Sequence, residues 1–155
     1  AALSSALVKL HASVEVVMTG HATEFITPLT FEQLTGNRVS VDTFDRNFVH
    51  QVEHISLARR SGLAIIAPAT ANIIAKMANG IADDLLSSVA LAAKAPIVVA
   101  PAMNSGMWEN EATRENIRRM RARGAVFVAP ESGDLACGTS GPGRMAAPEA
   151  IFRAV

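Results

Sequence analysis

Short apolar runs rich in β-branched residues alternate with amphipathic segments along the chain. The runs are VEVVM, LAIIA, PIVVA and AVFVA, at 14–18, 63–67, 96–100 and 125–129. Each has the length and composition of a strand buried on both faces. Helical patterns lie between them, at 70–79, 83–93 and 111–123. This alternation predicts an α/β fold with a parallel sheet built from βαβ units.

The remaining segments add one helix and one irregular connection. Residues 1–13 place Leu3, Ala6, Leu7 and Leu10 at helical spacing and lack a basic leader, which indicates an amphipathic helix rather than a signal peptide. The mixed polarity of 36–53 is typical of a loop. No repeat, low-complexity tract or linker divides the sequence, so we expect one domain over 1–155.

Composition narrows the classes of function. Of the 155 residues, 50% are hydrophobic and 18% are charged, which excludes a disordered chain, and polar residues interrupt every apolar run too often for a membrane span. The formal net charge is +0, so no overall field favours nucleic acid or an anionic membrane. The single cysteine excludes an internal disulfide and is compatible with a reducing cytosol.

Ligands of open parallel sheets bind beyond the carboxyl ends of the strands, and the residues that follow the runs here are unusual. They are Thr19-Gly20-His21, PATANIIAKM, PAMNSGMW and PESGDLACGTSGPGRM. Three of the four runs lead into Ala-Pro, where we expect proline to stop the strand. Candidate chemistry therefore lies in these four connections.

Two of these connections each allow a structural and a functional interpretation. In PATAN, Thr70 and Asn72 either cap a helix or meet a phosphate or the polar edge of a ring. In PAMNSGMW, Asn104 either caps a turn or orients a carboxylate, beside an adaptable apolar wall of Met103, Met107 and Trp108. Two such strand ends in one chain favour the functional interpretation.

The segment HQVEH fits the H-x-x-E-H spacing of inverted zinc peptidases. A catalytic zinc usually needs a third protein ligand, and only His11 and His21 remain among the histidines, so we predict no metal site. A satisfied or solvent-facing His50 is the better interpretation. His54 differs, because it begins HISLARR just before a strand and could act as an acid or base near neutral pH.

The glycine-rich segment GTSGPGRM lacks the G-x-G-x-x-G spacing and favours a mobile flap over a site rather than a nucleotide loop. Cys137 stands at its start. A lone cysteine is more often an inert apolar residue, but one in a glycine-rich loop is a candidate for proton or redox chemistry.

Taken together and in this order, HISLARR, PATAN, PAMNSGMW and ACGTSGPGRM closely resemble the flavin-dependent cysteine decarboxylases. The resemblance runs from about Val14 to Ile151. It implies a Rossmann-like (flavodoxin-like) sheet with helices on both faces, bound FMN, and homotrimers or homododecamers with interfacial active sites in the cytoplasm. Family members begin with a strand and a glycine-rich flavin-phosphate loop, and this chain begins in the helix that follows that loop.

The resemblance also implies roles for individual residues. The expected flavin contacts are Thr19, Thr70, Ala71, Asn72, Ile73 and Ala102. His54 and Cys137 match catalytic residues. The expected substrate contacts are Arg59 at a phosphate, Asn104 at the carboxylate, and Met103, Met107 and Ala136.

The implied reaction is the decarboxylation of 4′-phosphopantothenoylcysteine to 4′-phosphopantetheine in coenzyme A biosynthesis. A cysteine carboxylate lacks an electron sink, so the flavin would first oxidise the thiol to a thioaldehyde and later return the hydride, with Cys137 supplying a proton. One alternative is a peptidyl-cysteine decarboxylase of peptide-antibiotic biosynthesis, which Arg59 and the segment ACGTSGPGRM, similar to the family's mobile substrate-recognition clamp, disfavour. The other is a non-catalytic flavoprotein subunit that regulates a partner, against which the presence of both His54 and Cys137 argues.

Overall fold

The computed structural model describes residues 1–43, 53–134 and 140–155. The chain separates into two compact units, one made of 1–60 with 82–93 and the other of 61–81 with 94–155. The expectation of a single domain over the whole chain stays a prediction.

The second unit contains a three-stranded parallel sheet in the order β1-β2-β3. Its strands are β1 Ala64–Ala69, β2 Ile97–Pro101 and β3 Val126–Phe127. The central strand is the most buried, because Val98 and Val99 expose 2% and 0% of their surface. The runs at 63–67 and 96–100 are confirmed as strands, whereas the run at 125–129 pairs only through Val126 and Phe127.

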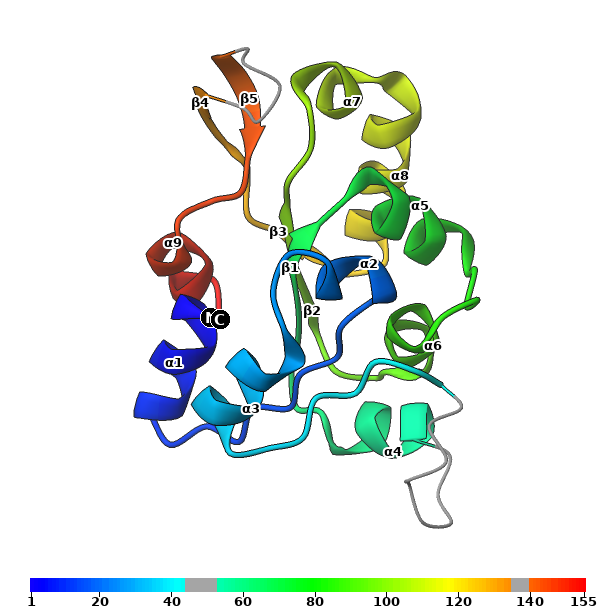
Figure 1. Ribbon diagram of the computed structural model, residues 1–155. Coiled ribbons are helices and arrows are strands. Elements are labelled where there is room, and N and C mark those ends of the chain that lie inside the picture. Colours follow the sequence, from blue (N-terminus) through cyan, green and yellow to red (C-terminus); the bar gives the residue numbers. More distant parts are fainter. Residues whose placement is uncertain (44–52, 135–139) are drawn as a thin grey trace. The chain divides into compact units, whose positions relative to one another are not determined.

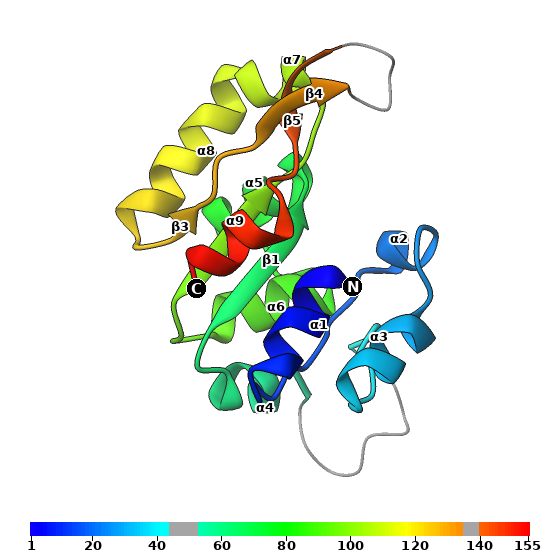
Figure 2. The same cartoon turned by 90° about the vertical axis from the view of Figure 1, so that its left-hand side faces the viewer.

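Helices cover both faces of this sheet. Figure 1 shows α5 and α8 on one face and α9 on the other, and Figure 2 views α9 in front of the strands. These helices are α5 Ala71–Asn79, α8 Glu111–Ala122 and α9 Pro148–Arg153. The predicted helices at 70–79 and 111–123 are confirmed, as is the α/β fold with a parallel sheet.

The expectation that proline stops the strands is wrong for β1, because Pro68 lies within the strand and Ala69 still follows it, but it is correct for β2, whose last residue is Pro101. The register of β1 shifts between Ile66 and Ala69, which removes Pro68 from the regular ladder, so its missing N–H costs no hydrogen bond there. After Pro101, the N–H of Ala102 donates to the carbonyl oxygen of Ala69 over 2.9 Å. The two strands therefore stay paired as far as the turns that follow them.

In the first unit the described residues are mostly helical. The helices are α1 Ala2–Lys9, α2 Gly20–Thr23, α3 Pro28–Thr35, α4 Glu53–Arg60 and α6 Leu85–Ala92. The predicted N-terminal helix and the helix at 83–93 are confirmed. Asp84 starts α6 with a capping box, in which the N–H of Ser87 donates to the Asp84 carboxylate over 2.7 Å.

The strand expected at 14–18 is wrong. Within the described ranges, this segment pairs only through an isolated parallel bridge between Val17 and Ser40. The reason is local. The carbonyl oxygen of Val14 accepts its hydrogen bond from a side chain, Asn37 Nδ2, over 2.8 Å, and not from a backbone N–H that would extend the ladder. A single bridge does not make a ladder.

The loop expected at 36–53 is correct for 36–43, where the Ser40 bridge is the one regular pairing described. Residues 44–52 lie outside the described residues, and Glu53 already begins α4. The sequence patterns missed α2, α3 and an antiparallel hairpin of β4 Glu131–Asp134 and β5 Ser140–Arg144. No helix among the described residues has the length and apolarity needed to span a bilayer.

Candidate functional site

The carboxyl ends of β1 and β2 lie side by side in the second unit. Ala69 is the register partner of Pro101, and the hydrogen bond from Ala102 to Ala69 ties the two strand ends together. The PATAN turn follows one end and the PAMNSGMW turn follows the other. The sheet therefore brings these two motifs to one edge, as the strand pattern predicted.

At the first strand end, Thr70 caps α5. Its side-chain oxygen accepts a hydrogen bond from the N–H of Ile73 over 3.3 Å, so the capping interpretation is correct. Thr70 and Asn72 are nevertheless exposed, while Ile73 is buried at 6%. The first N–H groups of a helix have no acceptor within the helix, so those of Ala71 and Asn72 can donate to an anion or a polar ring edge.

At the second strand end, Asn104 caps α7 Ser105–Glu109. Its side-chain oxygen accepts from the N–H of Gly106 over 2.8 Å, and its carbonyl oxygen accepts from the N–H of Trp108 over 2.9 Å. The cap fixes the orientation of the amide, with Oδ1 toward the helix and the Nδ2 donor group on the other side. Asn104 is exposed, so capping and recognition of a carboxylate are compatible here.

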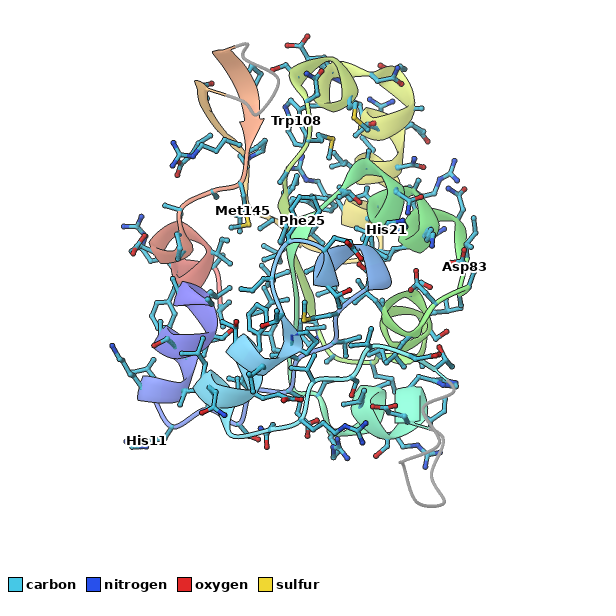
Figure 3. The ribbon with its side chains drawn as sticks, viewed as in Figure 1. His11, His21, Phe25, Asp83, Trp108 and Met145 are labelled. Carbon is cyan, nitrogen blue, oxygen red and sulfur yellow. The ribbon has the colours of Figure 1, made fainter. Side chains whose placement is uncertain are left out.

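Soft apolar side chains flank Asn104. Met103 is half-buried, and Met107 on α7 exposes 49% of its surface. Trp108, which Figure 3 labels beside α7, is half-buried. An exposed methionine next to a polar amide is an adaptable surface for a flat or irregular ligand.

The returning arm of the β4–β5 hairpin lies directly on the Asn104 turn. The N–H of Met103 donates to the carbonyl oxygen of Gly143 over 2.9 Å, and a Cβ at residue 143 would overlap the Met103 carbonyl oxygen. A Cβ at Gly141 would lie 2.5 Å from Ser105 Oγ. β5 is therefore docked on the turn rather than a free flap, which corrects our expectation for that arm.

Sequence reasoning missed this docking, although a signal was present. Gly141 and Gly143 are two residues apart in β5, so both face the same side of the strand. Two glycines on one face of a strand indicate a close approach by another piece of backbone. Ser105 was also missed; its hydroxyl is buried and has no hydrogen-bond partner within 1–43, 53–134 and 140–155.

Three predicted site residues belong to the first unit. Thr19 accepts from the N–H of Ala22 over 3.2 Å and caps α2. His54 is half-buried in the first turn of α4, and Arg59 is exposed near its end. Three further predicted or discussed residues, His50, Ala136 and Cys137, lie outside the described residues.

Within the described ranges, no group of three His, Cys, Asp or Glu side chains could hold a metal ion, but His50 of HQVEH lies outside those ranges, so the absence of a zinc site stays a prediction. Figure 3 shows His11 beyond the end of α1 and His21 on α2, well apart from each other. These were the two remaining histidines that the sequence offered as a third ligand.

A family model described as Flavoprotein matches residues 2–155, and the chain belongs to this family. Among curated relatives, the coenzyme A biosynthesis bifunctional protein CoaBC of Bacillus subtilis (strain 168) is 46% identical over 152 residues, which cover 98% of this chain and 37% of that protein. The CoaBC protein of Haemophilus influenzae is 45% identical over 95% of this chain. The chain thus spans a little over a third of the curated relatives that it matches.

Solved structures lead to the same group of proteins. A mutant PPC decarboxylase complexed with pantothenoylaminoethenethiol superposes with a TM-score of 0.86 at 30% identity, covering 99% of this chain and 86% of that one. The FMN-dependent cysteine decarboxylase SpaF gives a TM-score of 0.79 at 32% identity, covering 97% and 86%. The family resemblance inferred from the four motifs is confirmed.

Proposed function

We propose that this chain is an FMN-dependent carboxy-lyase that converts 4′-phosphopantothenoylcysteine to 4′-phosphopantetheine in coenzyme A biosynthesis. The observation that carries the proposal is the pairing of the carboxyl ends of β1 and β2, each followed by an exposed polar cap, Thr70 or Asn104, in a chain of the Flavoprotein family. Support comes from relatives named for coenzyme A biosynthesis and from a structural neighbour that holds pantothenoylaminoethenethiol.

The described residues at this edge fit a flavin. Thr70 and Asn72 offer polar groups in exposed positions, and the first N–H groups of α5 can donate to a ring carbonyl or a phosphate. Met103 and Met107, beside Asn104, offer adaptable apolar surface to the substrate rather than to the flavin. We assign Thr70, Ala71, Asn72, Ile73 and Ala102 to flavin binding, and Thr19 from the first unit.

When bound, the flavin supplies a reversible two-electron oxidation, which gives the substrate carboxylate an electron sink. The chain's own residues hold the substrate and move protons. Asn104 holds the carboxylate through its amide nitrogen, since the α7 cap already occupies its oxygen. An uncharged amide orients a carboxylate without the strong attraction of a cation, which would oppose the loss of CO2.

The other roles rest on the motif resemblance. His54 acts as a general acid or base, Arg59 contacts the substrate phosphate, and Cys137 donates the last proton. Ala136 contacts the substrate beside Cys137. Assembly into homotrimers or homododecamers, with active sites at subunit interfaces, and a cytoplasmic location belong to the same proposal.

The test uses the full-length protein. Its cofactor is released by denaturation and identified, and CO2 release from 4′-phosphopantothenoylcysteine is then measured. We expect FMN rather than FAD, and turnover that falls by roughly a hundredfold or more in a flavin-loaded His54→Asn variant. A folded full-length protein without flavin would contradict the assignment of FMN. Near-normal turnover in the His54→Asn variant would contradict the catalytic role of His54.

A second experiment addresses Cys137 and the rival functions. Because an alcohol is far less acidic than a thiol, Cys137→Ser should release CO2 but accumulate a product two hydrogens lighter than the aminoethanethiol. The saturated product formed at the wild-type rate would exclude the role of Cys137. CO2 from a cysteine-terminated peptide alone would favour peptide modification, and no CO2 from either substrate would favour the regulatory subunit.

A further inference from the structure

A buried carboxylate stands directly before His54. Glu53 is the first residue of α4 and exposes only 8% of its surface. Acidic side chains are seldom buried unless they are paired, because desolvation of the charge is costly. The carboxylate of Glu53 accepts a hydrogen bond from the hydroxyl of Ser40, which is itself 5% exposed. No role in the proposed reaction uses this pair.

Ser40 connects this carboxylate to a second segment of the first unit. Its N–H donates to the carbonyl oxygen of Val16 over 3.0 Å, and its carbonyl oxygen accepts from the N–H of Met18 over 2.9 Å. With the hydroxyl on Glu53, the N–H, C=O and O–H of Ser40 all make hydrogen bonds. Ser40 is therefore a fixed point between the segment at 16–18 and the start of α4.

Each end of this connection leads to a predicted site residue. Thr19 follows Met18 and caps α2, and His54 follows Glu53 in the first turn of α4. α4 is also held by its buried residues Leu57 and Ala58, one turn further along. These apolar contacts limit the position of the helix, whereas the Ser40–Glu53 bond fixes its first residue.

We propose that Glu53 and Ser40 are positioning residues for His54, fixing the start of α4 against the segment that carries Thr19. The inference rests on the proposed function, in which His54 is the proton-exchanging group. A displaced general acid or base loses much of its effect, because proton transfer depends on distance and alignment. The negative charge also suits the positive end of the helix dipole at the first turn of α4.

The test compares three variants of the full-length flavin-loaded protein. Glu53→Gln keeps the size and one acceptor oxygen, so kcat should stay within a few-fold of wild type. Glu53→Ala and Ser40→Ala each remove the bond, and kcat should fall by roughly tenfold to a hundredfold with KM little changed. In the double variant the loss should be no greater than in the more affected single variant, because both remove the same contact.

A second readout does not depend on turnover. The imidazole NMR signals of His54, assigned by their disappearance in His54→Asn, should move in Glu53→Ala and Ser40→Ala and stay near wild type in Glu53→Gln. The NMR signals can be measured even if no decarboxylation is found. Absence of turnover would therefore contradict the proposed function, whereas unmoved His54 signals would contradict the positioning role.

Glu32 provides a matched control in the same unit. Its carboxylate accepts a hydrogen bond from the N–H of Val39, the residue before Ser40, over 3.1 Å. Unlike the Ser40–Glu53 bond, this bond does not involve a residue of α4. Glu32→Ala should lower stability while leaving kcat and the His54 signals unchanged. If Ser40→Ala folds with wild-type kcat and unmoved His54 signals, the positioning role is overturned, whether or not Glu53→Ala folds.

Discussion

The main-chain nitrogen of Met103 donates to the carbonyl oxygen of Gly143 over 2.9 Å, at a point where residue 143 has room for no side chain. The backbone of β5 thus rests on the backbone of the turn that presents Asn104. Gly143 also has φ +144°, a conformation that residues with a side chain rarely adopt. The lack of room for a Cβ and the positive φ both require glycine at position 143.

Gly143→Ala should separate the hairpin from the Asn104 turn. We expect a loss of about 1–3 kcal/mol in the free energy of unfolding, together with weaker substrate binding. Denaturant unfolding and KM measure the two effects. Gly133→Ala is the control, since a Cβ there meets Arg144 Cδ at an ordinary 3.6 Å; an equal loss in both variants would contradict the argument.

Gly141 and Ser105 should behave as a coupled pair. A Cβ at residue 141 would lie 2.5 Å from Ser105 Oγ but 3.4 Å from Ser105 Cβ, so Ser105→Ala removes the tighter contact. Gly141→Ala alone should cost about 1–3 kcal/mol of stability, and Ser105→Ala should restore part of it. Unfolding of both single variants and the double variant gives the coupling energy; strictly additive effects would disprove the contact.

Ser105→Ala alone should leave the protein as stable as before, or more stable. The serine hydroxyl is buried without a hydrogen-bond partner in the described part of the chain, and such a group usually lowers stability. Thermal unfolding of this variant checks the prediction. A clear loss of stability would show that the hydroxyl has a partner in the folded protein.

Thr70→Ala should weaken both the helix and the flavin site. The loss of the α5 cap should cost about 1 kcal/mol, and flavin affinity should fall as well. Asp84→Ala is the matched control, because Asp84 caps α6 and is not a predicted flavin contact. Flavin affinity is measured by titration. Equal affinity in the two variants would show that Thr70 caps the helix but does not contact the flavin.

The pKa of the Glu111 carboxyl is lowered, first by the hydrogen bond from Arg118 and then by its positive charge. A depressed carboxyl pKa contributes stability above the ordinary glutamate pKa, and this contribution disappears as the pH falls through the depressed value. Arg118→Ala should raise the Glu111 pKa toward the ordinary value, as carboxyl NMR titration would show. The pair is exposed, so overall stability should change little.

The sequence patterns identified the strands and helices whose signals are local. The runs at 63–67 and 96–100 became β1 and β2, as β-branched composition favours, although burial is extensive only in β2, while β1 buries Ile66 and Ala69. The similar run at 14–18 did not form a strand, since pairing depends on what the neighbouring segment offers, and Asn37 supplies a side chain there. A strand prediction made from the residues of one segment does not include the segment that must pair with it.

The same limit applies to the site. Thr70 and Asn104 were predicted because they follow strands, and the structure places both at one sheet edge. The Ser40–Glu53 and Met103–Gly143 hydrogen bonds were missed, since each joins residues distant in sequence. For the Met103–Gly143 bond, the spacing of Gly141 and Gly143 indicates a close backbone approach but not which segment approaches. For the Ser40–Glu53 bond, neither residue type nor spacing indicates the partner.

The position of Trp108 has an optical consequence. The chain contains one tryptophan and no tyrosine, so its near-ultraviolet emission comes almost entirely from the short helix α7 that Asn104 caps. Because Trp108 is half-buried, that emission responds to the polarity around α7. A yellow chromophore bound near α7 would also quench it by energy transfer. The native residue is thus a built-in fluorescent reporter for the Asn104 turn, with no label required.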